Sequence, residues 1–201
     1  MVSTNVVVAG FVDPARSYQA LSALKGCHAD GRIVLESAAV VERAADGGLR
    51  VADGADNVGP VGLATGSLIG MLVGVLGGPI GVLLGWGAGG LVGGAVDATR
   101  VVKSDDALTV LGRAIPPGST AVIATVTEPA IEVVDGEMTR LGGQVTRRPL
   151  GEVVAELEVA EEAAEAAAHE ARRTVREQRK AKLRANAEAK LSTAKEKLHI
   201  S

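Results

Sequence analysis

Two stretches of the chain spell the same order of elements: NVVVAGFVDPA at residues 5–15 and TAVIATVTEPA at residues 120–130. Each begins with a short run of apolar and β-branched residues, which is typical of a buried strand. Each ends with an acidic residue, a proline and an alanine, which favour the first turn of a helix. The repeat therefore predicts a strand followed by a helix at both places.

The residues after each stretch extend the two units. The expected apolar face is Ala15, Tyr18, Leu21 and Leu24 in the first helix, and Val133, Val134, Met138 and Leu141 in the second. RIVLESAAVVER (32–43) and QVTRR (144–148) predict the strands that follow these helices. Two βαβ units in one chain predict an α+β protein with a ferredoxin-like βαββαβ sandwich.

Between the two units, no charged residue occurs from Asn57 to Val96. Glycine recurs there at every fourth position in two ladders: Gly62, Gly66, Gly70, Gly74 and Gly78, then Gly77, Gly81, Gly85, Gly89 and Gly93. On a helix, a step of four makes a slowly winding groove, in which a second helix backbone can approach closely. The turn signal Gly77-Gly78-Pro79 predicts a helical hairpin with a glycine groove on each arm.

The remaining apolar face of this hairpin needs a partner. Its members Leu68, Leu72, Leu83, Leu84 and Trp86 are expected to contact lipid or another protein surface. The arms, at about 61–76 and 80–96, are short for membrane spans, which need about 20 residues. Insertion into or onto a membrane, with a homo-oligomer held by the glycines, is the leading hypothesis, and burial of many hairpins in a large soluble assembly is the alternative.

Basic residues near the ends of the hairpin bear on location. Arg43, Arg50, Arg100 and Lys103 favour the cytoplasmic side of a membrane. The N-terminus has no basic region before its apolar run and no cleavage pattern after it, so we expect no signal peptide. The expected location is the cytoplasmic side of the cell membrane, or the cytoplasm for a soluble assembly.

Residues 152–201 contain neither glycine nor proline and are rich in Ala, Glu, Lys and Arg, which predicts one long helix. The expected organisation is a first half-domain (1–56), the hairpin (57–98), a second half-domain (99–150) and the long helix (151–201). Seven acids and no Lys or Arg occupy 151–170, whereas ten bases and three acids occupy 171–201.

Three interpretations of this charge pattern stay open. Acids near the start and bases near the end of a helix suit the helix dipole. The acidic half of one helix can instead lie against the basic half of another copy. Alternatively, Arg172, Arg173, Arg176 and Arg179 contact anionic lipid. Nucleic acid is disfavoured, because aromatic residues for base stacking make up only 1 % of the chain.

Several segments together resemble a family of bacterial proteins of unknown function, usually described as uncharacterised membrane proteins. They are VVERAADGGLRV (40–51), the glycine-rich hairpin, SDDALTVLGRAI (104–115), PPGSTAVIATV (116–126) and a closing βαβ unit with Gly-Gly. The resemblance covers roughly residues 33–150. It implies membrane association and supplies no reaction, ligand or catalytic residue.

Patterns for catalysis or cofactor binding do not occur. His28, His169 and His199 are far apart, and Cys27 is the only cysteine, so no metal-ligand spacing arises. The glycines precede no Lys-Ser/Thr and do not join a strand to a helix, so they do not predict a phosphate loop. We expect a non-enzyme without cofactor or small-molecule substrate, that is, a membrane scaffold, shaping protein or pore. A ligand-binding sensor is a further alternative on fold analogy alone.

Overall fold

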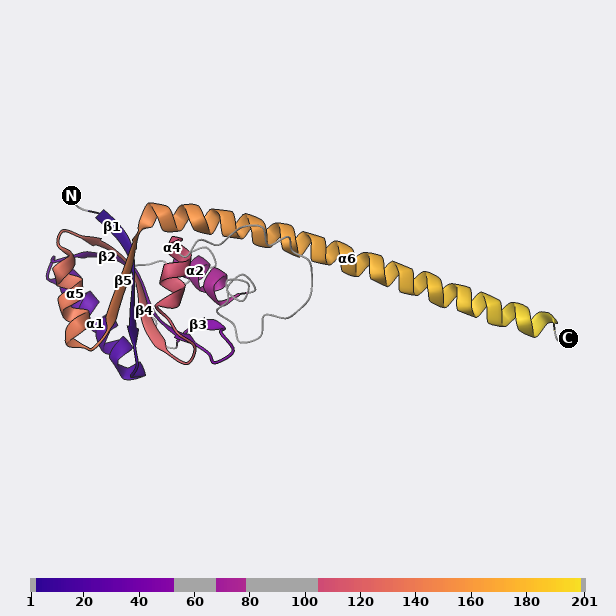
Figure 1. Ribbon diagram of the computed structural model, residues 1–201, viewed down its shortest axis with the longest axis horizontal. Coiled ribbons are helices and arrows are strands. Elements are labelled where there is room, and N and C mark those ends of the chain that lie inside the picture. Colours follow the sequence, from indigo (N-terminus) through magenta and orange to yellow (C-terminus); the bar gives the residue numbers. More distant parts are fainter. Residues whose placement is uncertain (1–2, 53–67, 79–104, 200–201) are drawn as a thin grey trace. The chain divides into compact units, whose positions relative to one another are not determined.

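The computed structural model describes residues 3–52, 68–78 and 105–199 (Figure 1). The chain divides into two compact units, Met1–Glu161 and Glu162–Ser201. The predicted hairpin lies for the most part outside the described residues, so its existence as a hairpin stays a prediction.

The first unit is built on a five-stranded antiparallel sheet. Its strands are β1 (Ser3–Phe11), β2 (Val34–Arg43), β3 (Leu49–Val51), β4 (Thr120–Glu128) and β5 (Gln144–Pro149). They lie in the order β3-β2-β4-β1-β5, so β4 lies between β2 and β1, and β1 lies between β4 and β5. Without the short edge strand β3, this is the strand order of a ferredoxin-like sandwich, which confirms the predicted α+β fold.

One face of the sheet is covered by α1 (Pro14–Ala29) and α5 (Ile131–Arg140), the helices that connect strands within the two βαβ units. The side chain of Asp13 accepts a hydrogen bond from the backbone amide of Ala15 and so caps α1, as predicted. Helix α5 ends at Arg140, and Gly142 just beyond it has a φ of 77°, the left-handed conformation that glycine adopts most easily. These local signals explain why the repeat could be recognised in the sequence.

The buried face of α1 differs from the predicted one. Ala15 and Tyr18 are exposed, whereas Ser17 and Ala20 are fully buried beside Leu21 and Leu24. A pattern of apolar residues does not include Ser17, because serine carries a polar hydroxyl. In the structure this hydroxyl is buried and donates a hydrogen bond of 2.9 Å to the hydroxyl of Thr120 in β4. A buried polar group with such a partner is tolerated in a core.

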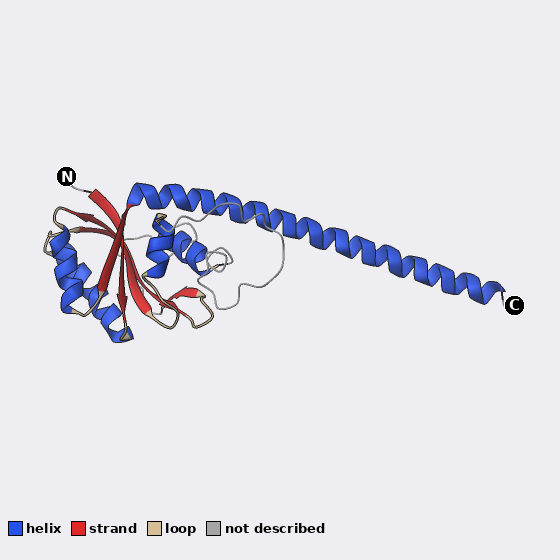
Figure 2. Ribbon diagram, in the orientation of Figure 1, coloured by secondary structure: helices blue, strands red, loops and turns tan. Residues whose placement is uncertain are grey.

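The opposite face is covered by α2 (Leu68–Gly77), α4 (Ala107–Arg113) and the first turns of α6 (Leu150–His199), as Figure 2 shows. These elements bury their apolar side chains against β1, β2 and β4. The second unit, in contrast, consists of helix alone. Among the described helices, none combines the length and the apolar character that a membrane crossing requires.

Candidate functional site

Helix α2 is the part of the glycine-rich stretch that the structure describes. Ile69, Leu72, Val75 and Leu76 are buried in the core on the sheet, and Leu68 is partly buried against the same core. The expectation that Leu72 contacts lipid or a partner is therefore wrong for this arrangement. Leu72 packs in one core with small and β-branched strand residues such as Ala39, Val41 and Ala121. Burial on this face of the sheet removes its apolar surface from water.

Two of the glycines of α2, the half-buried Gly70 and the exposed Gly74, lie on the side of the helix away from its buried leucines. At 100° per residue, Gly70 and Gly74 are roughly opposite the buried Leu72 and Leu76. Gly74 is exposed, and a Cβ placed on it meets no described atom within 4 Å. The first ladder thus continues along an outward face of α2.

Gly77 serves a different purpose at the end of α2. A Cβ there would lie 2.6 Å from both the backbone nitrogen and the Cβ of Leu49, so this position allows α2 to approach β3 closely. Gly78 follows it as the last described residue of the predicted turn. The other predicted packing and contact residues, Gly62, Gly66, Pro79, Gly81, Leu83, Leu84, Gly85, Trp86, Gly89 and Gly93, lie outside the described residues.

A buried arginine holds the end of α2. Arg43, the last residue of β2, is 1 % exposed, and burial lowers its pKa. Its Nη1 donates hydrogen bonds to the carbonyl oxygens of Leu76 (3.2 Å) and Gly47 (2.8 Å). A cation at the C-terminus of a helix interacts favourably with the helix dipole. Arg43 is therefore an interior anchor for α2, a role that the sequence did not predict, and its expected contribution to the orientation of a membrane protein stays a prediction.

A glutamate from the C-terminal helix holds the start of α4. The two carboxylate oxygens of Glu156 accept hydrogen bonds from the backbone amides of Ala107 (2.7 Å) and Leu108 (2.8 Å). The side chain of Asp106, at the N-cap position, makes no capping hydrogen bond. Glu156 thus caps α4 from another helix, while its neighbours Val153 and Leu157 are buried in the core.

These two anchors bracket the remainder of the glycine-rich stretch. Arg43 binds the helix that precedes residues 79–104, and Glu156 binds the helix that follows them. Both helices pack in one core on one face of the sheet. The end of α2 and the start of α4, which flank these residues, therefore lie on the same face of the sheet.

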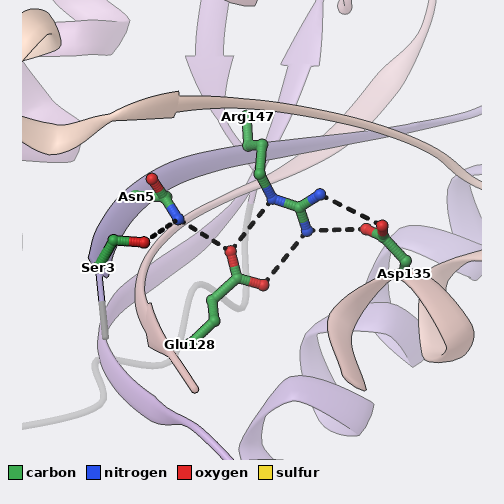
Figure 3. Close-up of polar contacts among 5 residues, drawn as sticks. All are labelled: Ser3, Asn5, Glu128, Asp135 and Arg147. Carbon is green, nitrogen blue, oxygen red and sulfur yellow. Dashed lines mark hydrogen bonds and ion pairs between the residues drawn. The ribbon is translucent and has the colours of Figure 1, made fainter. Parts of the chain in front are cut away.

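A second polar cluster lies at one end of the sheet (Figure 3). Arg147 of β5 makes bidentate contacts with Glu128 (3.1 and 3.2 Å) and with Asp135 of α5 (2.7 and 3.2 Å). Asn5 donates a hydrogen bond of 3.2 Å to Glu128, whose side chain is fully buried. Although burial opposes its charge, the hydrogen bonds to Asp135 and Glu128 raise the pKa of Arg147.

This cluster is satisfied from within. Two carboxylates surround one guanidinium, and every contact of that guanidinium is to a side chain that fixes strand β4 or helix α5. Glu128, expected to open the helix, is instead the last residue of β4. The cluster therefore secures the α5 side of the domain.

Chemistry of other kinds is equally sparse among the described residues. They contain no group of three His, Cys, Asp or Glu side chains arranged to hold a metal ion. Cys27 is buried, and burial raises its pKa, so that its thiolate is disfavoured. On α6, the predicted contact residues Arg172, Arg173, Arg176 and Arg179 are exposed, and Arg173 pairs with Glu177 at 3.3 Å.

Residues 63–163 match the family described as "Protein of unknown function (DUF1269)". The chain belongs to this family. The DUF1269 match begins within the glycine-rich stretch and ends within α6, so it includes Glu156 but not Arg43. It confirms the resemblance to an uncharacterised family, while a membrane location and a bacterial origin stay predictions. No curated protein and no solved structure matches the chain.

Sequence analysis missed both anchors. Arg43 was interpreted as a flanking charge and Glu156 as one of seven acids in the tail. The available signal for Arg43 was its place two residues after the apolar run AAVV (38–41), all four members of which are buried. Glu156 lies between Val153 and Leu157, the two apolar residues of α6 that are buried in the core. Their spacing of four indicates which side of the helix packs on the sheet.

Proposed function

We propose that this protein is a non-enzymatic, self-assembling protein whose glycine-rich stretch lies in or inserts into a membrane. The observation that carries the proposal is the orientation of α2. Its leucine and isoleucine side chains pack within the domain, while the glycine face formed by Gly70 and Gly74 lies opposite them, and Gly74 is exposed. A helix face without side chains suits close approach by another helix.

The anchoring of α2 and α4 limits how the stretch meets lipid. Residues 79–104 comprise 26 positions, whereas two membrane crossings need about 40 residues. A single crossing would place α2 and α4 on opposite sides of the bilayer, although both pack in one core. With α2 in place, the stretch is therefore proposed to enter one leaflet or to lie in the interface.

A soluble assembly, in which glycine-rich stretches of several copies cover one another, is the second candidate. The burial of Leu72 favours it, because part of the apolar surface once assigned to lipid is already covered by the sheet. It shares with the first candidate the use of the glycine face for contact between copies.

Trp86, the only tryptophan, lies in this stretch and provides a direct test. The full-length protein is mixed with liposomes of neutral and anionic phospholipid, floated on a density gradient, and its fluorescence is measured with lipids brominated at different depths of the acyl chain. The proposal predicts flotation, and quenching of Trp86 that is strongest for the shallow bromine positions.

Two other results would contradict this. Strongest quenching at the bilayer centre would mean that α2 leaves the sheet and the stretch spans. Without flotation or quenching, a large soluble particle with blue-shifted Trp86 emission would support the soluble assembly and exclude the membrane.

Gly74→Leu tests the glycine face separately from the fold. Because Gly74 is exposed and has open space around it, leucine should leave the domain folded and prevent close helix contact between copies. Gly136→Leu is the matched control, since Gly136 is an exposed glycine in α5 with equally open surroundings. Sedimentation should give smaller assemblies for Gly74→Leu alone. Equal assembly of both variants would remove the glycine face from the proposal.

A further inference from the structure

The second unit of the chain is helix without described tertiary contacts. Every described side chain from Glu161 to Leu183 is exposed, including Val175 at 62 % and Leu183 at 63 %. Val175 lies five full turns from the buried Leu157, so both belong to one face of α6. The apolar face that docks the start of α6 therefore continues beyond the domain.

The small residues of the tail follow this face at steps of three and four. They are Ala160, Ala164, Ala167 and Ala171 and, after the polar Thr174 and Gln178 at the next two positions of the same register, Ala181 and Ala185. This is the spacing of a coiled-coil seam, and alanine in such a seam allows two helices to pack closely. Small residues at this spacing fit many partner helices. The charges on either side of the seam identify which partner fits.

Between residues 158 and 184, most pairs of charges four residues apart work against a solitary helix, Arg173 with Glu177 being the exception. Like charges lie four residues apart at Glu158/Glu162, Glu161/Glu165, Arg172/Arg176, Arg176/Lys180 and Lys180/Arg184. Such pairs are neighbours on the helix surface and destabilise it. The helix dipole does not account for them, because its effect is confined to the first and last turns. The change of sign instead occurs between Glu170 and Arg172, in the middle of the helix.

An antiparallel second copy removes this conflict. With a two-fold axis at Ala171, Glu170 lies opposite Arg172, Glu162 opposite Lys180 and Glu158 opposite Arg184. Glu165 opposite Glu177 is the only like-charged match between residues 158 and 184. A parallel pair would set acid against acid along one half and base against base along the other. The interface is self-complementary, as a two-fold dimer requires.

We propose that the C-terminal helices of two copies pair antiparallel, acidic half against basic half, with the two-fold axis near Ala171. This pairing specifies one contact of the proposed self-assembly. It rests on that proposal only because both require contact between copies. It involves neither the glycine face nor a membrane, so the two ideas can fail separately.

Cysteine cross-linking tests the orientation. In full-length protein carrying Cys27→Ser and Gly74→Leu, Ala171→Cys is compared with Ala185→Cys, which lies two heptads further along the same face. Both are oxidised with copper phenanthroline in the absence of lipid. The proposal predicts disulfide-linked dimers for Ala171→Cys and their loss for Ala185→Cys. Dimers for both variants mean a parallel pair, and dimers for neither mean no pairing, and either result overturns the proposal.

Charge exchange tests the cause. Glu158→Lys with Glu162→Lys, and separately Lys180→Glu with Arg184→Glu, should each abolish cross-linking through Ala171→Cys. All four changes in one chain should restore it, because an antiparallel pair again matches acid with base. Helical content by circular dichroism controls for unfolding of the tail. If cross-linking is unaffected, or if the tail binds anionic vesicles in place of a second copy, the proposal is wrong.

Discussion

The two faces of the sheet are covered in different ways. On one face, α1 and α5 connect strands that lie close in the sequence, and each helix begins and ends at local signals such as Asp13 and Gly142. On the other face, α2 and α4 belong to the segment inserted between the two βαβ units, and α6 is the C-terminal extension. Arg43 binds the end of α2 and Glu156 binds the start of α4, each from a distant part of the chain. The inserted helices are thus held by charged side chains at their termini, where backbone groups lack partners within the helix.

The largest effect should come from Arg43→Ala. The substitution leaves a cavity and removes the buried donor to Leu76 and Gly47, so we expect a loss of about 2–5 kcal/mol in the free energy of unfolding. Urea denaturation measures it. Arg50→Ala is the control, because Arg50 is exposed and pairs with Glu42 at the surface, where a pair contributes less than about 1 kcal/mol. Equal losses would mean that α2 does not depend on its anchor.

Arg147→Ala probes the other face. It leaves the buried carboxylate of Glu128 without its cation, and breaking a buried pair in this way costs about 3 kcal/mol. The neighbouring substitution Arg148→Ala should change the unfolding free energy by less than about 0.5 kcal/mol. A mild effect of Arg147→Ala would show that water reaches Glu128 and that α5 is held by apolar contacts alone.

Glu156→Ala should cost about 1–2 kcal/mol, because the amides of Ala107 and Leu108 lose a charged acceptor. Hydrogen exchange at these two amides should accelerate more than exchange in α5. Glu152→Ala, one turn earlier on α6 and exposed, serves as the control. Unchanged exchange at Leu108 would remove Glu156 from the anchoring of α4.

Gly74→Ala and Gly77→Ala should shift stability in opposite directions. Alanine at the open position 74 gains roughly 1 kcal/mol of helix propensity. At position 77 the added Cβ would meet the backbone of Leu49 at 2.6 Å and push α2 from β3. Thermal unfolding of the two variants compares them directly. Stabilisation by both would mean that α2 is not seated on β3.

The smallest effect concerns Glu137 of α5. A hydrogen bond from Arg140 lowers the pKa of Glu137 from its usual 4.5, so its contribution to stability is present above that pH and is lost as the pH falls through the folded-state value. Glu137→Gln should therefore flatten the dependence of unfolding free energy on pH below about 4.5, by less than 1 kcal/mol because the pair is near the surface. Parallel curves for the two proteins would contradict this.

Sequence alone predicted the sheet well and the second face poorly, for a physical reason. Strand runs and helix caps such as Asp13-Pro14 act over a few residues, so the two βαβ units and the long tail helix could be recognised. Arg43 and Leu76 are 33 positions apart, and Glu156 and Ala107 are 49 apart. Periodicity carries no information on such pairs. The same limit led Leu72 to be assigned to lipid, because an apolar helix face looks alike whatever covers it.

The two anchors also determine how freely the chain can vary between them. Since α2 and α4 are fixed in the domain, the segment that links them, residues 79–104, carries the entropy cost of joining two fixed points. That entropy changes slowly, by about 0.6 kcal/mol for each doubling of length. Insertions, deletions and changes of composition there should be inherited at little cost to the fold. The domain can thus keep its architecture while the length and sequence between α2 and α4 change.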